Sequence, residues 1–326
     1  MEIITSNLLT PMVLCYILGL AAGKLGSDLR VPKQIYESIT IYLLFAIGFK
    51  GGVEIAQTGL VAMLVPALAS VALGLAIPLY GYPMLRRLGK LSREDSASIA
   101  AHYGSVSAVT FAAALAVLES NAIPYNSYMN ALLALMEPPA IILGVALAGR
   151  ARHLASGTAN HINWGYFLRE AFVSNSVILL VGGMLVGALS GQSGYESMRP
   201  FLVDPFKGAL SFFLLELGVV TSERLSEVRK MGGFLSVFGI LFPIFNGFVG
   251  VSLGWAVGLN LGGAALLGTL AASGSYIAAP AAMRVAVPQA NPALSLTAVL
   301  GITFPFNIII GIPLYLMMAR WLFSIS

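Results

Sequence analysis

Long apolar runs recur along the whole chain, and short segments with charged residues, glycine or proline separate them. Runs of about 17 to 25 residues are long enough for a helix to cross a hydrocarbon core roughly 30 Å thick. The pattern predicts an all-α polytopic membrane protein. We place ten transmembrane helices at about 8–24, 34–50, 58–83, 95–118, 128–149, 168–190, 201–221, 232–257, 262–284 and 294–318.

Composition agrees with this prediction. The 326 residues are 58% hydrophobic and only 10% charged, whereas a soluble domain carries roughly 25% charged residues. Such a chain cannot offer water enough polar surface, which excludes a soluble enzyme or binding domain. The single cysteine, Cys15, also excludes a disulfide within the chain.

The basic residues predict how the chain is oriented. The loops after spans one, three, five, seven and nine hold all but four of the 18 lysines and arginines, the exceptions being Lys50, Arg199, Lys207 and Arg320. The positive-inside rule then places these loops in the cytoplasm and both termini outside, in the periplasm. The net charge of +4 therefore reflects orientation and does not indicate a nucleic-acid partner.

Four segments of the first half return in the same order about 165 to 170 residues later, as expected of an internal repeat. Five spans per half make the second copy enter the membrane from the opposite face. The sequence thus predicts two inverted five-helix repeats, residues 1–160 and 161–326, in one membrane unit, a plan typical of secondary transporters. The matched residues are Gly19 with Gly183, Gly23 with Gly187, Gly48 with Gly218, Gly104 with Gly274, Ser105 with Ser275, Pro138 with Pro305 and Gly144 with Gly311.

Spans four and nine each contain a cluster of small polar residues. Glycine and serine weaken a helix, and freed backbone groups persist in a membrane only where protein or a cavity satisfies them. We expect both helices to break or cross near the bilayer middle, so that helix N-termini and hydroxyls face an anion. Close helix packing by small residues is the alternative. The candidate anion-binding residues are Gly104, Ser105, Ser107, Thr110, Gly274 and Ser275.

A few polar residues within the spans are candidates for coupling transport to a cation. Glu137 lies directly before two prolines, which we expect to distort span five and free carbonyls beside the carboxylate. Glu216, Ser273 and Asn307 are further candidates, although each could equally make a structural hydrogen bond. Lys50 is expected at a helix end, with its ammonium reaching the membrane interface.

The stretches GSVSAVTFAAALAVLE, ALLALMEPPA and APAAMRVAVPQANP resemble the sodium-dependent bicarbonate transporter family of cyanobacteria, and the similarity begins at LLFAIGFKGG, residues 43–52. The resemblance implies a trimeric ten-helix symporter of the inner membrane. Such a protein would import bicarbonate with sodium and would need no cofactor. The resemblance also implies that span four and the start of span nine hold the anion.

Two departures from the family pattern concern the site and its regulation. The family has an aspartate near the start of span nine where this chain has Tyr276, and a hydroxyl-rich run of span ten is replaced here by residues 298–300. The loop after span five is only about residues 151–167, which argues against a PII-like cytoplasmic regulator.

Two alternatives to a cation-coupled bicarbonate transporter stay open at this point. One is a proton-coupled transporter of another small solute, such as a carboxylate, with Glu137 or Glu216 carrying the proton. The other is an intramembrane enzyme with Glu137 and His102 as acid and base. The absence of an HExxH motif or a paired aspartate motif disfavours the enzyme.

Overall fold

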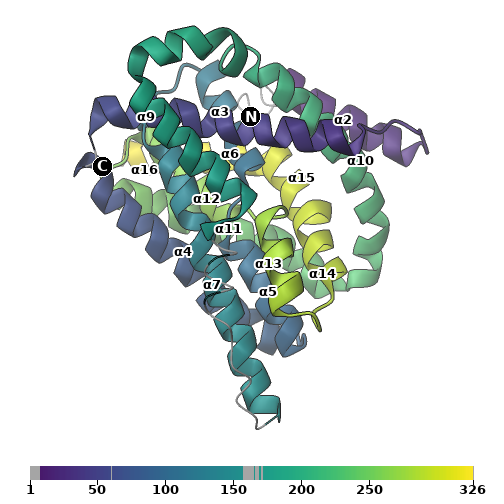
Figure 1. The fold of residues 1–326 in the computed structure, drawn as a ribbon. Coiled ribbons are helices and arrows are strands. Elements are labelled where there is room, and N and C mark those ends of the chain that lie inside the picture. The colour runs from purple at the N-terminus through teal and green to yellow at the C-terminus, as the bar shows by residue number, and fades with distance from the viewer. Residues whose placement is uncertain (1–7, 60, 157–164, 166–168, 170–171, 326) are drawn as a thin grey trace.

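A computed structural model describes residues 8–59, 61–156, 165, 169 and 172–325, and within these residues all regular secondary structure is helical. The predicted fold class is therefore confirmed as all-α (Figure 1). Each predicted span contains at least one helix at the same place in the sequence. The predicted boundary between the repeats, at residues 160 and 161, lies outside the described residues.

The first half of the chain forms six helices in the described residues. They are α2 (Pro11–Lys24), α3 (Lys33–Thr58), α4 (Leu64–Arg87), α5 (Arg93–Gly104), α6 (Ala108–Ser120) and α7 (Met129–Ser156). The second half forms α9 (Asn175–Leu202), α10 (Phe206–Met231), α11 (Gly233–Ala256), α12 (Leu261–Ala272), α13 (Ala278–Ala286), α14 (Pro292–Leu296), α15 (Phe304–Phe306) and α16 (Ile312–Ser324).

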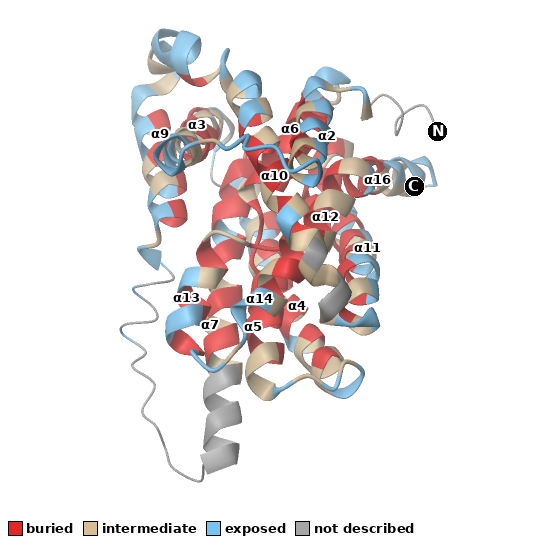
Figure 2. Cartoon of the chain, turned by 90° about the vertical axis from the view of Figure 1, so that its right-hand side faces the viewer, coloured by how far each residue is buried: buried red, intermediate tan, exposed pale blue. Residues whose placement is uncertain are grey.

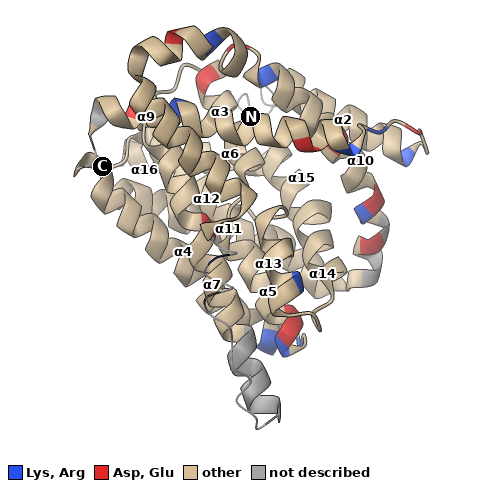
Figure 3. Cartoon of the chain, viewed as in Figure 1, with Lys and Arg blue, Asp and Glu red and all other residues tan. Residues whose placement is uncertain are grey.

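Seven segments of the described chain are long and apolar enough to cross a membrane, and α2 and α12 are shorter apolar helices. The α10 helix is not among them, because its second half carries several charged residues. Charged side chains are sparse over most of the bundle, as Figure 3 shows. The chain is therefore a multi-pass membrane protein.

Some helix boundaries differ from the predicted ones. The α9 helix continues to Leu202 through a kink at Gly191, whose positive φ of 60° suits glycine, so the predicted loop after 190 is helical. The α3 helix extends to Thr58, which places Lys50 inside the helix and not at its end. The α7 helix runs continuously through Pro138 and Pro139, so the distortion expected at these prolines does not end the helix.

The helices pack in two sets. In the first set α2 lies against α10 and α3 lies against α9, and α2 and α3 cross the top of the view in Figure 1. In the second set α4, α5 and α7 pack together, and α11, α12 and α16 pack together. Figure 2 shows that buried residues concentrate in α5, α6 and α12.

Glycines let the helices of the first set touch backbone to backbone. A Cβ atom at Gly19 of α2 would collide with α10, and one at Gly218 of α10 would collide with α2. The same reciprocal arrangement joins α9 and α3, where Gly183 and Gly48 each meet the backbone of the other helix. Small residues at such seams are the usual means of close helix association in membranes.

Candidate functional site

The predicted interruptions of spans four and nine are confirmed. Helix α5 ends at Gly104, the chain is extended at Ser105 (φ −83°, ψ 154°), and α6 begins at Ala108. Helix α12 ends at Ala272, the chain is extended at Ser273 (φ −88°, ψ 165°), and α13 begins at Ala278. We call the segment 105–107 the first break and the segment 273–277 the second break.

The two breaks are hydrogen-bonded to one another. The Ser107 N–H donates to Ser273 Oγ at 2.9 Å, and the Ser275 N–H donates to the His102 carbonyl at 2.8 Å. These two hydrogen bonds satisfy a backbone N–H group in each unwound segment, as a membrane interior requires. The residues that sequence analysis assigned to the anion from the two halves of the chain therefore do converge.

The side chains of the first break cap the helix that follows. Ser107 Oγ accepts hydrogen bonds from the Thr110 N–H at 3.2 Å and from Thr110 Oγ1 at 3.0 Å, so Ser107 is the N-cap of α6. Ser105 is fully buried, and its hydroxyl has no hydrogen-bond partner within the described structure. A buried hydroxyl without a partner costs roughly 1–3 kcal/mol, which a ligand at the break would relieve.

Glycine is needed more strictly at Gly104, directly before the first break, than at Gly274 in the second break. A Cβ at Gly104 would lie 2.6 Å from Pro78 Cδ and 2.9 Å from Ala140 Cβ. A Cβ at Gly274 would lie 3.0 Å from the nearest atom, a methyl group of Val299. Gly104 therefore allows α4, α5 and α7 to approach closely, whereas Gly274 has slightly more room.

A small cavity lies where the two breaks meet α3, α7 and α9. Its volume is about 10 Å³, enough for about one water molecule and too small for a four-atom anion. Ser107 and Ser275, one from each half of the chain, both line it. The complete lining is Leu44, Val106, Ser107, Ala108, Glu137, Ser176, Ser275, Tyr276 and Ile277.

Glu137 is the carboxylate of this cavity. Its side chain is 5% exposed and hydrogen-bonds to Ser176 near the start of α9. Because α7 is continuous, the two prolines after Glu137 leave two helix carbonyls without their usual amide donors nearby. The cavity itself combines this carboxylate with the hydroxyls of Ser107, Ser176 and Ser275, oxygen ligands that suit a hard cation.

The other candidate cation residues have structural partners. Glu216 Oε2 accepts the Val31 N–H at 2.8 Å, and Glu216 does not line the cavity. Asn307 Nδ2 donates to the Ala272 carbonyl at 2.9 Å, at the end of α12, while its oxygen accepts from Tyr315 at 2.8 Å. Asn307 therefore supports the second break from span ten.

Ser273 and Ser275 are likewise engaged within the protein. Ser273 Oγ donates to the Leu270 carbonyl at 2.8 Å while it accepts from Ser107. Ser275 Oγ accepts the Ala279 N–H at 3.2 Å and faces the cavity. Among these serines, Ser275 is the better placed to exchange its partner for a ligand.

Sequence analysis did not predict the contacts of three residues, Ser176, His102 and Lys50. Ser176 gives no local signal, because its partner Glu137 lies in the other half of the chain. His102 is 2% exposed, and its carbonyl accepts the Ser275 N–H of the second break. The ammonium of Lys50 pairs with Glu119 at 2.6 Å, a partner that sequence analysis did not predict; the expected position of Lys50 at the membrane interface stays a prediction.

Two discontinuous helices that meet inside a multi-pass membrane bundle are typical of secondary transporters. The model of the Na+-dependent bicarbonate transporter superfamily matches residues 11–320, which is nearly the whole chain. The chain therefore belongs to this family of transporters and is not an enzyme. No curated protein matches the chain.

Proposed function

We propose that this protein imports bicarbonate together with Na+ by alternating access, with the anion held between the two helix breaks. The observation that carries the proposal is the meeting of Ser107 and Ser275, from opposite halves, in the wall of one buried cavity. The N-termini of α6 and α13 begin at this place, and helix N-termini favour negative charge.

The anion would use the hydroxyl groups that the breaks already present. The unpartnered hydroxyl of Ser105 supplies one donor, and Ser107, Thr110 and Ser275 supply others by exchanging internal bonds. Gly104 and Gly274 let the backbone come near the ligand. The volume of about 10 Å³ corresponds to a closed arrangement, which opens when the two sets of helices move relative to one another.

The cation would bind beside Glu137, with Ser273 and the carbonyls at the ends of α5 and α12 as further oxygen ligands. Helix C-termini and carboxylates favour positive charge, so anion and cation would bind side by side at opposite helix ends. Glu216 and Asn307, whose partners are structural, would act less directly. Na+ is a transported ion in this proposal and not a resident cofactor.

Alternating access would follow from an inverted repeat of residues 1–160 and 161–326. The seams support this, because Gly19 meets α10 in the way that its sequence match, Gly183, meets α3. Likewise, Gly48 meets α9, and its sequence match, Gly218, meets α2. A pair of contacts that interchanges in this way is expected of two copies related by a two-fold axis in the membrane plane.

Orientation and assembly complete the proposal. The distribution of lysine and arginine supports a protein of the bacterial inner membrane with both termini in the periplasm. Large exposed apolar side chains on α4, α9 and α11 would contact lipid and, in a trimer, other copies of the chain. The loop expected at 151–167 is described only to Ser156, so the absence of a PII-like regulator stays a prediction.

The test is uptake of labelled bicarbonate into proteoliposomes, with an inward Na+ gradient compared with a matched proton gradient. We expect uptake that needs Na+. Uptake driven by protons alone would overturn Na+ coupling and support the proton-coupled alternative, with Glu137 as the proton carrier. Absence of uptake under both gradients, by protein that elutes as a single folded species, would overturn bicarbonate as the substrate.

A further inference from the structure

A second, larger cavity lies at the end of α6 that is farther from the breaks. Its volume is about 260 Å³, far more than that of the cavity between the breaks, and it is formed by α3, α6, α7 and the segment that joins α9 to α10. We call it the lysine cavity. Its lining is Ala46, Ile47, Lys50, Leu115, Ala116, Glu119, Asn130, Leu202, Val203, Asp204, Phe206 and Lys207.

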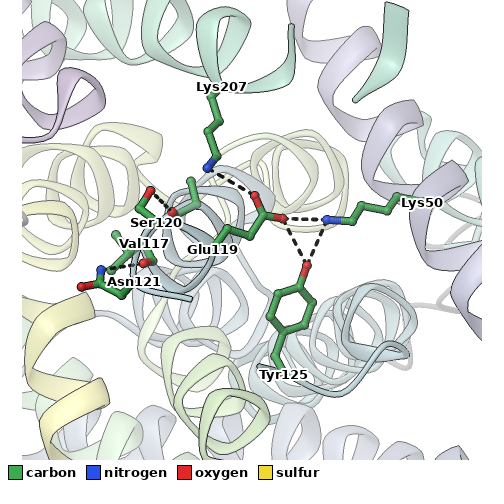
Figure 4. Close-up of polar contacts among 8 residues, drawn as sticks. Lys50, Val117, Glu119, Ser120, Asn121, Tyr125 and Lys207 are labelled. Atoms are coloured by element: carbon green, nitrogen blue, oxygen red, sulfur yellow. Dashed lines mark hydrogen bonds and ion pairs between the residues drawn. The ribbon is translucent and has the colours of Figure 1, made fainter. Parts of the chain in front are cut away.

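Two ammonium groups share one carboxylate in this cavity (Figure 4). Lys50 Nζ lies 2.6 Å from Glu119 Oε1, and Lys207 Nζ lies 3.5 Å from Glu119 Oε2. The other carboxylate of the lining, Asp204, pairs with Arg199 at 3.2 Å. Two ammonium groups therefore line the cavity beside a shared carboxylate. Glu54, one turn beyond Lys50 on α3, does not line the cavity, although its carboxyl group interacts with the charge of Lys50.

Tyr125 fixes the geometry of this cluster. Its hydroxyl accepts from Lys50 at 3.0 Å and donates to Glu119 at 3.2 Å. Burial raises the pKa of the Tyr125 phenol to about 12, so the hydroxyl keeps its proton at neutral pH. The ammonium of Lys50 is thereby held in place at the cavity wall, and its side chain is only 25% exposed.

Asn130 is an independent sign that the lysine cavity takes a ligand. This residue is 1% exposed, and neither its amide nitrogen nor its amide oxygen has a hydrogen-bond partner within the described structure. It packs against Gly51, where any Cβ would collide with it. A buried amide without partners is costly, and this one lines a cavity in which a ligand could supply them.

The lysine cavity and the cavity between the breaks lie along the same three helices. On α3, Ile47 lines the lysine cavity and Leu44 lines the cavity between the breaks. On α7, Asn130 lines the former and Glu137 the latter, two helical turns or about 10 Å apart. On α6, the sites lie at opposite ends of one helix. The two cavities therefore lie along one seam of the bundle.

We propose that the lysine cavity is a recruitment site, in which Lys50, Lys207 and Asn130 bind a small planar oxyanion before it passes to the breaks. This proposal rests on the proposed function, in which the anion is bicarbonate. Bicarbonate has the same planar CO2 group as the Glu119 carboxylate. Glu119 shows how such a group lies between the two ammoniums. It also competes with the incoming anion, so the site releases its ligand readily.

The test uses charged thiol reagents and a cysteine placed in the cavity wall. The natural cysteine is removed and Val203, which lines the cavity, is replaced (Cys15→Ser with Val203→Cys). Labelling rates are measured with an anionic and a cationic methanethiosulfonate of similar size. We expect the anionic reagent to react faster, and Lys50→Gln with Lys207→Gln to reduce the ratio of the two rates roughly tenfold.

The matched control is Lys33→Gln, which removes the same charge from an exposed position near the other end of α3. We expect it to leave the ratio unchanged. Glu119→Gln should raise the anionic rate, because it removes the competing carboxylate. Bicarbonate should slow labelling of the unmodified cavity, and Asn130→Ala should weaken that protection.

Each outcome bears on one proposal. Protection by bicarbonate without uptake into proteoliposomes would keep the recruitment site and overturn the proposed transport of bicarbonate. Uptake without protection, or equal rates for the two reagents, would overturn the recruitment site and leave transport standing. An equal change of the rate ratio in Lys33→Gln would show a general surface effect and also overturn the recruitment site.

Discussion

The two helix breaks occupy corresponding positions of the chain, yet they are built differently. In the first, Ser107 caps α6 with its side chain, and the neighbouring Ser105 hydroxyl is left without a partner. In the second, the Ser275 hydroxyl accepts the Ala279 N–H in the first turn of α13, and Tyr276 packs edge-on against Phe304 with ring centroids 5.5 Å apart. The first break thus offers donors to a ligand, whereas an aromatic ring fills space at the second.

This difference suggests that the two breaks have different roles. The first break presents hydroxyls and an ordered helix N-terminus, which suit the anion. The second is braced by Asn307 and by the His102 carbonyl, and its buried hydroxyl without a partner in the described structure is that of Tyr276. The chemistry of the meeting point thus follows from the particular residues in each break.

The largest expected effect comes from filling the first break. Gly104→Leu should abolish uptake, because even a Cβ would lie within 2.9 Å of Ala140 and closer to Pro78. The control is Gly208→Leu, since nothing lies within 4 Å of a Cβ at that position. Uptake at the control rate by folded Gly104→Leu protein would show that the first break is not a close-packed site.

A smaller change is expected when the charge beside the breaks is removed. Glu137→Gln should raise the Na+ concentration needed for half-maximal uptake roughly tenfold or more, because it removes a charged ligand but keeps the shape. The matched control is Glu216→Gln, which alters a buried glutamate that holds the Val31 N–H. An unchanged Na+ dependence in Glu137→Gln would assign Glu137 a structural role.

The smallest effect is expected at the aromatic residue of the second break. Tyr276→Phe should change the KM for bicarbonate by less than about twofold, because the edge-on packing against Phe304 is kept. The measurement is uptake against bicarbonate concentration at saturating Na+. A large rise in KM would show that the Tyr276 hydroxyl binds the anion, and that the second break contributes more than its serines.

The sequence was most informative where a local pattern determines local structure. Apolar runs predicted the helices, and the small-residue clusters around Gly104 and Gly274 predicted the breaks, because both effects act within one segment of chain. The partners of single side chains were not predictable. Lys50 with Glu119 and Glu137 with Ser176 join residues far apart in the sequence, so only tertiary packing brings them together.

The prolines of span five show a second limit of local reasoning. Pro138 and Pro139 remove two helical hydrogen bonds, and an isolated helix would bend or break there. Instead α7 stays continuous, packed between α4, α5 and α9. Packing on several sides holds the helix together where its own hydrogen bonds cannot, a compensation that neighbouring helices commonly provide in membrane proteins.

The most direct test of one anion site shared by both breaks is the KM for bicarbonate in Ser107→Ala and Ser275→Ala. Ser70→Ala, which removes a buried hydroxyl bonded to the Pro66 carbonyl of α4, is the control. We predict that both variants raise KM roughly tenfold, the effect of losing one hydrogen bond to a charged ligand, while the control does not. A raised KM in only one of the two variants would contradict a site built from both halves of the chain.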